Sequence, residues 1–141
     1  MTALSPRLQA VVDALPLRPG MRVLEVGGAP GAAARAVAAR VGPDGHVLVL
    51  DRSGSGIRQI QTNCDSEISA GTLSVLHAPV EDFALPDGVA PFDLAFACRV
   101  GALDGRHPRL YEPALANLRR ALKPGALLYV DTGSPLTAIA L

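Results

Sequence analysis

Short apolar runs alternate with turn signals along most of the chain. The runs predict five strands, at residues 21–26, 46–50, 72–77, 92–97 and 126–130. Helix-forming segments precede or separate them, at residues 5–15, 32–40, 53–70 and 108–122. Continuous apolar runs are typical of strands that are buried on both faces, and helices between such strands indicate a parallel sheet. The pattern therefore predicts an α/β fold.

Capping and proline signals set the ends of the helices. Ser5 can cap the first helix with Pro6 in its first turn, and this helix should end before Pro16. Ser53 can cap the third helix in the same way. Pro113 is expected to mark a restart or a kink in the last helix, because proline cannot donate a backbone hydrogen bond.

Length and composition limit the classes of function. The 141 residues suit one domain with one core. The 13 basic residues balance the 13 acidic ones, and aromatic residues are 4% of the chain, so we expect neither nucleic acid nor a membrane as a partner. No apolar run approaches the roughly 20 residues that span a bilayer. Because the N-terminus also lacks a secretory signal, we expect a cytoplasmic location.

The cysteines do not indicate a metal site. Cys64 and Cys98 lie far apart in the sequence, and neither belongs to a Cys-x-x-Cys pair. Such spacing favours reduced thiols over a disulfide framework or a zinc site. We therefore expect no bound metal.

A glycine-rich segment follows the first predicted strand and leads directly into a helix. It contains Gly27, Gly28 and Gly31. A loop here presents backbone N–H groups and the positive end of a helix at the carboxyl edge of the sheet. Glycine also permits a positive φ and lets a ligand approach the main chain. The loop either binds a ligand or is a tight turn that packs Val37 and its neighbours on the sheet.

An acidic residue follows the second predicted strand. Asp51 lies about twenty residues after the glycine loop, where a carboxylate can accept hydrogen bonds from both hydroxyls of a ribose. The alternative is that Asp51 caps the turn at Ser53 and Gly54. The combined spacing favours the ribose role.

Four segments resemble the motifs of class I S-adenosylmethionine-dependent methyltransferases. Residues 23–31 (VLEVGGAPG) resemble the first motif, residues 47–51 the second strand with its acidic end, residues 91–96 (PFDLAF) the fourth strand, and residues 118–126 (LRRALKPGA) the segment before the fifth. The resemblance covers about residues 21–131. It implies a single domain, residues 1–141, with a Rossmann-like, doubly wound, mainly parallel sheet of about five strands in the order 3-2-1-4-5, without the family's usual terminal strand pair.

The resemblance also implies where S-adenosylmethionine would bind. The methionine portion would lie beside residues 25–31, with Glu25 orienting its ammonium group, and the ribose on Asp51. Adenine would lie near residues 80–82, and the substrate rim would begin at residues 98–100. The cofactor-binding residues expected on this basis are Glu25, Gly27, Gly28, Ala29, Gly31, Asp51, Arg52, Val80, Glu81 and Cys98. Glu25 could instead be a simple strand-end charge.

Three features depart from the family pattern. Ala29 replaces a glycine of the loop, so we expect an adjusted cofactor contact. Pro79 falls, in one alignment, where relatives place an acidic contact to adenine. The chain also stops soon after the fifth strand, which would leave an exposed edge. Either residues 136–141 or a second subunit would cover that edge, so we consider a homodimer.

Charged residues after the fourth strand are candidates for chemistry and for substrate binding. His107 could act as a base near neutral pH, although a histidine in such a loop could also be a solvated turn residue. Arg99, Arg106 and Arg109 could bind an acidic substrate or simply lie on the surface.

We therefore favour methyl transfer from S-adenosylmethionine to a small-molecule acceptor. The first alternative is a noncatalytic cofactor-binding or assembly module of the same fold, which the short carboxyl end favours. The second is a nicotinamide-binding domain, whose fingerprint Gly27, Ala29 and Ala32 meet only loosely.

Overall fold

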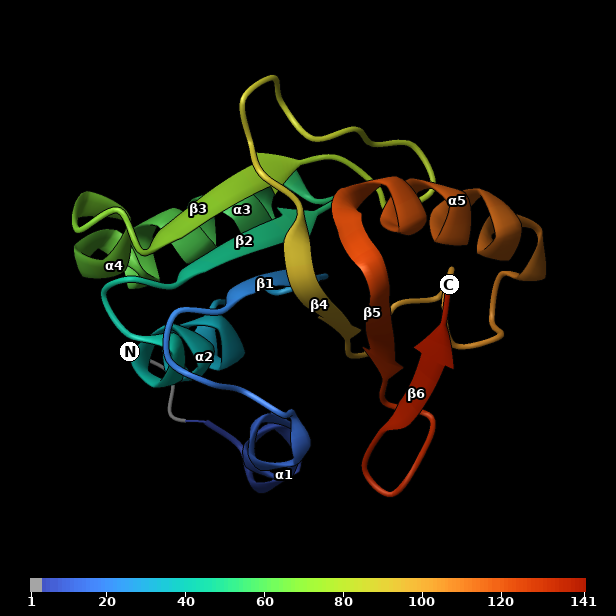
Figure 1. The fold of residues 1–141 in the computed structure, drawn as a ribbon, viewed down its shortest axis with the longest axis horizontal. Coiled ribbons are helices and arrows are strands. Elements are labelled where there is room, and N and C mark those ends of the chain that lie inside the picture. The colour runs from blue at the N-terminus through green and yellow to red at the C-terminus, as the bar shows by residue number, and fades with distance from the viewer. Residues whose placement is uncertain (1–3) are drawn as a thin grey trace.

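Six strands form one sheet in the computed structural model, which describes residues 4–141 (Figure 1). The strands are β1 (Arg22–Val26), β2 (His46–Asp51), β3 (Leu73–His77), β4 (Phe92–Ala97), β5 (Leu122–Val130) and β6 (Thr137–Ala140). Their order is β3-β2-β1-β4-β5-β6, and the first five pair in parallel. The predicted α/β class and the order 3-2-1-4-5 are confirmed, with a sixth, antiparallel strand added at the edge.

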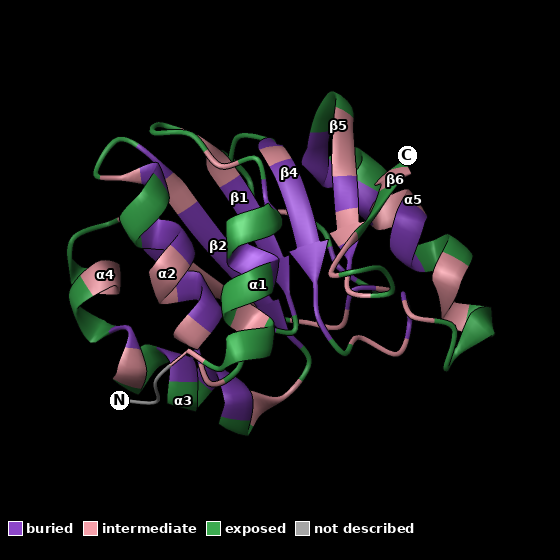
Figure 2. Cartoon of the chain, turned by 90° about the horizontal axis from the view of Figure 1, so that it is seen from below, coloured by how far each residue is buried: buried purple, intermediate pink, exposed green. Residues whose placement is uncertain are grey.

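Helices cover both faces of this sheet. They are α1 (Pro6–Ala14), α2 (Ala32–Val41), α3 (Gly54–Asn63), α4 (Asp65–Ser69) and α5 (Tyr111–Ala121). Figure 2 shows β1, β2 and β4 buried along nearly their whole length. Because side chains alternate along a strand, Val23 of β1 packs with α1 and α2, whereas Leu24 and Val26 pack with α5.

The ends of the helices follow the predicted signals with two differences. Ser5 caps α1, accepting the N–H of Leu8 at 3.2 Å, and the helix ends before Pro16 as predicted. The predicted third helix is divided at Cys64 into α3 and α4. The last helix restarts at Tyr111 after a 3₁₀ turn over Pro108–Leu110, so Pro113 lies in its first turn, where a missing N–H costs no helical hydrogen bond.

Strand β5 begins four residues earlier than predicted. Leu122 pairs with Phe92, and the next aligned pair is Leu127 with Leu94, so the register shifts between them. Gly125 has a φ of +80° within this irregular stretch. A continuous apolar run therefore marked only the regular part of the strand.

The carboxyl-terminal segment covers the outer edge of β5. Strand β6 pairs with it antiparallel, from Thr137 opposite Val130 to Ala140 opposite Leu127. Of the two alternatives for this edge, the chain's own tail is the one observed. A second subunit is not needed to cover β5, and the homodimer stays a prediction.

Within residues 4–141, no helix is both long enough and apolar enough to cross a membrane.

Candidate functional site

A cavity of about 330 Å³ opens at the carboxyl ends of the parallel strands. Its walls come from the ends of β1 and β2, the segment after β3 and the loop after β4. The lining residues are 26–27, 50–52, 78–81, 99–102 and 106–107. The order of the strands reverses between β1 and β4 at this edge. Open α/β sheets bind ligands at such a reversal, so this cavity is the candidate site.

The cavity gathers about half of the predicted site residues. Those that line it are Gly27, Asp51, Arg52, Val80, Glu81 and His107. Those that lie outside its lining are Glu25, Gly28, Ala29, Gly31 and Cys98. In the second group, Glu25 lies near the end of β1, Cys98 directly follows β4, and the other three residues belong to the rest of the glycine loop.

Glu25 is a buried acid directly behind the glycine loop. Its residue is 3% exposed, and its Oε1 atom has no hydrogen-bond partner among the described residues. A Cβ atom on Gly28 would lie 3.0 Å from this oxygen and 2.4 Å from Cγ1 of Val49, so only glycine fits there. Burial, followed by repulsion from Asp51, raises the pKa of Glu25 to about 8. An unpaired buried acid of this kind is suited to a cationic ligand.

Gly27 forms the part of the loop that faces the cavity. Its φ of +72° lies in the left-handed region, and its N–H donates to the carbonyl of Leu50 at 2.7 Å. A Cβ atom at this position would lie 2.9 Å from Cγ2 of Val100, across the cavity wall. Both the backbone conformation and the close approach of Val100 therefore require glycine here.

Asp51 connects β2 with the glycine loop. Its Oδ2 accepts the N–H of Ala29 at 3.1 Å, and its Oδ1 accepts the N–H of Ser53 at 2.9 Å. The turn-capping role is thus present in the structure, and Asp51 also lines the cavity. A carboxylate oxygen has two lone pairs, so each keeps capacity for a hydroxyl donor. The two interpretations of Asp51 are compatible.

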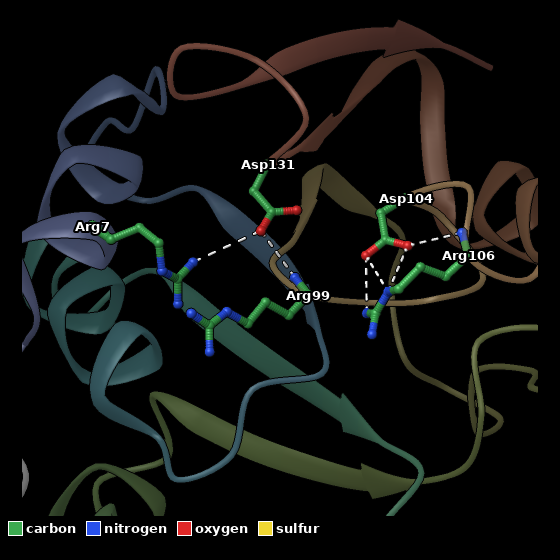
Figure 3. Close-up of polar contacts among 5 residues, drawn as sticks. All are labelled: Arg7, Arg99, Asp104, Arg106 and Asp131. Carbon is green, nitrogen blue, oxygen red and sulfur yellow. Dashed lines mark hydrogen bonds and ion pairs between the residues drawn. The ribbon is translucent and has the colours of Figure 1, made fainter.

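Arg99 has an unusual backbone conformation at the end of β4. Its φ of +56° is the one positive value among the non-glycine residues that the structure describes. The N–H of Arg99 donates to Oδ2 of Asp131 at 3.0 Å, and the N–H of Asp131 donates to the carbonyl of Ala97 at 3.2 Å. The Arg7 side chain lies 3.8 Å from the same Oδ2 (Figure 3). Asp131 therefore holds Arg99 in place.

The sequence interpretation did not single out Asp131. Asp131 directly follows the apolar run of the fifth strand, as Asp51 directly follows that of the second. This shared position could have identified Asp131 as a candidate site residue. Parallel strands bring both carboxylates to the same edge of the sheet.

The loop after β4 carries His107 and a local ion pair. Arg106 donates from Nε to both carboxylate oxygens of Asp104 at 3.0 Å, which holds the pKa of Asp104 below its ordinary value. The N–H of His107 donates to the carbonyl of Gly101 at 3.0 Å. A Cβ atom on Gly101 would lie 2.4 Å from the His107 ring, so the ring packs directly on this glycine. Arg109 lies on the 3₁₀ turn, outside the cavity lining.

The two thiols are buried and free. Burial, the first of several causes, raises the pKa of both Cys64 and Cys98 to about 11. Both are therefore protonated near neutral pH, which excludes them as activated nucleophiles. Among residues 4–141, no three His, Cys, Asp or Glu side chains are grouped to hold a metal ion.

Comparison with known sequences identifies relatives. Residues 23–125 match a family model described as a methyltransferase domain. The chain is 32% identical over 126 residues to the ubiquinone/menaquinone biosynthesis C-methyltransferase UbiE of Ectopseudomonas mendocina, covering 86% of the chain and 47% of that protein. It is 35% identical over 126 residues to the ribosomal RNA large subunit methyltransferase E of Syntrophobacter fumaroxidans, covering 84% and 61%. The chain thus spans roughly half the length of these relatives.

Solved structures share the fold. A crystal structure of a SAM-dependent methyltransferase from Aquifex aeolicus matches with a TM-score of 0.69 and 25% identity, covering 91% of this chain and 69% of that one. Coclaurine N-methyltransferase bound to N-methylheliamine and SAH matches with a TM-score of 0.70 and 18% identity, covering 87% and 34%, and this likeness concerns the fold alone. Together with the family-model match, which spans most of the sheet, these findings show that the chain belongs to the class I S-adenosylmethionine-dependent methyltransferase family.

Proposed function

We propose that this chain binds S-adenosylmethionine in the cavity at the carboxyl edge of the sheet and transfers its methyl group to a small-molecule acceptor. The observation that carries the proposal is the buried Glu25 carboxyl, whose Oε1 atom has no partner among residues 4–141 and lies behind the glycine loop. A cofactor ammonium group would supply the missing partner through a charge-assisted hydrogen bond.

The residues around the cavity fit the remaining parts of the cofactor. Asp51 offers acceptor oxygens to the ribose hydroxyls, and Arg52 lies beside it. Val80 and Glu81 line the wall after β3, where the adenine would lie. Gly27 lines the cavity at the end of β1, where the methionine portion would lie. We propose these residues as the cofactor-binding set, supported by Glu25 and Gly28 from behind.

The chemical demands on the protein are modest. When bound, S-adenosylmethionine supplies an electrophilic methyl carbon and a neutral thioether leaving group. The chain then has to hold the acceptor's nucleophile in line with that carbon and exclude competing water. His107 lines the cavity and is the candidate to take a proton from an acceptor that must lose one.

The names of the relatives cover several classes of methyl acceptor, and only some of these are small molecules. UbiE acts in ubiquinone and menaquinone biosynthesis, whereas other similar proteins are named for ribosomal RNA or for protein L-isoaspartate. The equal numbers of basic and acidic residues favour a small molecule over RNA. The single domain, the cytoplasmic location and the homodimer stay predictions.

Calorimetric titration tests the proposal. S-adenosylmethionine and S-adenosylhomocysteine should each bind at one saturable site, NAD should not bind, and Glu25→Gln should weaken binding at least about tenfold. Saturable binding of NAD alone would overturn the proposal.

A noncatalytic cofactor-binding module of the same fold is the alternative, because the contacts proposed for the cofactor do not by themselves require a methyl acceptor. Transfer of a radiolabelled methyl group to a panel of small molecules distinguishes the two functions. Cofactor binding with no transfer to any acceptor, also in the presence of assembly partners, would favour the module.

A further inference from the structure

The cavity contains two arginine side chains that form no ion pair within residues 4–141. Three arginines line it, namely Arg52, Arg99 and Arg106. Arg106 is neutralised by Asp104 within its own loop. In the part of the chain that the structure describes, neither Arg52 nor Arg99 forms an ion pair with a carboxylate. The lining also contains two acids, Asp51 and Glu81, and neither pairs with these arginines among the described residues. Each of these two guanidinium groups is therefore free to bind an anionic ligand group.

Arg99 is the arginine whose position is best fixed. The hydrogen bond from its N–H to Asp131 holds a backbone conformation that a non-glycine residue rarely adopts. Asp131 also lies 3.8 Å from the Arg7 side chain. Figure 3 shows the Arg99 side chain extending toward the Arg7 guanidinium. Asp131 thus pairs with the guanidinium group of Arg7 and holds the backbone of Arg99, and the guanidinium group of Arg99 forms no ion pair among the described residues.

Arg99 lies on the side of the cavity opposite the residues proposed for the cofactor, so its guanidinium group would face the methyl acceptor. Glu25 and Asp51 belong to β1 and β2, on the side that we propose for the cofactor. Arg99 follows β4, beyond the point where the strand order reverses, and its neighbours Val100 and Ala102 add apolar lining.

Resting on the proposed function, we propose that the methyl acceptor is a compact, partly apolar molecule carrying a carboxylate, and that Arg99 binds this carboxylate with Arg7 beside it. Arginine suits this role because its planar guanidinium can donate two parallel hydrogen bonds to a carboxylate. Asp131 fixes the backbone from which Arg99 reaches the cavity.

A matched pair of probes tests the inference without knowledge of the natural acceptor. Benzoate and its neutral analogue benzamide are titrated into protein saturated with S-adenosylhomocysteine at low ionic strength. Benzoate should bind at least about tenfold more tightly than benzamide, and added salt should reduce the difference. Arg99→Gln should remove the preference and change the affinity for S-adenosylhomocysteine by less than about twofold.

Two further variants keep the test decisive. Arg99→Gly removes the guanidinium and suits the positive φ, so it should reproduce the effect even if Arg99→Gln folds poorly. Arg109→Gln alters an arginine outside the lining and should leave the preference intact.

Three outcomes would overturn the inference. Equal binding of benzoate and benzamide would remove the carboxylate preference. A preference that survives both Arg99 variants would remove Arg99 from the site. Loss of S-adenosylhomocysteine affinity in these variants, at least about tenfold, would assign Arg99 to the carboxylate of the cofactor instead. Failure of the proposed function is distinguishable, because the unmodified protein would then bind no S-adenosylhomocysteine at all.

Discussion

The carboxylate of Asp51 accepts the backbone N–H of Ala29, with 3.1 Å between Ala29 N and Asp51 Oδ2. This hydrogen bond joins the end of β2 to the loop after β1, across 22 positions of sequence. The residue proposed to hold the ribose therefore also holds the shape of the loop beside it. Its substitution is expected to affect binding through both contacts.

Asp51→Ala should weaken S-adenosylhomocysteine binding at least about tenfold, because it removes the ribose acceptor and loosens the loop. The free energy of unfolding should fall by only about 1–2 kcal/mol, since Ala29 is exposed and water can satisfy its N–H. Calorimetry and urea unfolding measure the two effects. Asp87→Ala, in an exposed loop, is the control. Unchanged affinity in Asp51→Ala would remove the ribose assignment.

Glu25 should make the stability of the free protein fall as pH rises. Its ordinary pKa of 4.5 applies in the unfolded chain, and burial raises the folded value to about 8. Between these values the folded state holds a proton that the unfolded state has lost, so Glu25 costs up to about 1.4 kcal/mol of stability per pH unit. Urea unfolding between pH 5 and 8.5 should show Glu25→Gln gaining stability relative to the unmodified protein as pH rises. A constant difference across this range would contradict the raised pKa.

Cofactor binding should release a proton from Glu25 below pH 8. The carboxyl is protonated in the free site, and pairing with an ammonium group requires the ionised form. Titration with S-adenosylhomocysteine at pH 6.5 in two buffers of different ionisation enthalpy measures the release. Glu25→Gln should abolish the buffer dependence. Identical heats in both buffers for the unmodified protein would show that Glu25 does not ionise on binding.

Gly28→Ala should destabilise the fold by about 1–3 kcal/mol, the usual cost of overpacking a core. Its Cβ atom would lie 2.4 Å from Cγ1 of Val49 and 3.0 Å from Oε1 of Glu25. Thermal unfolding measures the cost. Gly54→Ala is the matched control, because its Cβ atom would meet nothing closer than 3.4 Å and alanine favours the helix that begins there. Equal melting temperatures for Gly28→Ala and the unmodified protein would contradict the tight packing.

The sequence signals failed where pairing is irregular or distant. The apolar run from 126 to 130 predicted only the regular part of β5. The strand begins earlier because Leu122 pairs with Phe92, a residue 30 positions away in the sequence. The sequence of residues 136–141 does not distinguish an edge strand from an unpaired tail. The pairing of Ile139 with Leu128 in the structure shows that this segment is an edge strand. Local propensity is a weak guide in such segments, because the partner strand determines whether they are ordered.

The sequence by itself determined the α/β class and the position of the glycine loop, because apolar runs, helix signals and glycines are local features with fixed geometric consequences. It also placed Asp51 at the carboxyl edge. The strand order followed from the resemblance of its motifs to those of the methyltransferase family. Only the tertiary structure decided that Glu25 lies buried and unpaired behind Gly28, and that Asp131 holds Arg99 from 32 residues away. Burial and long-range hydrogen bonds depend on which segments pack together, and the charge state of an acid follows from that packing.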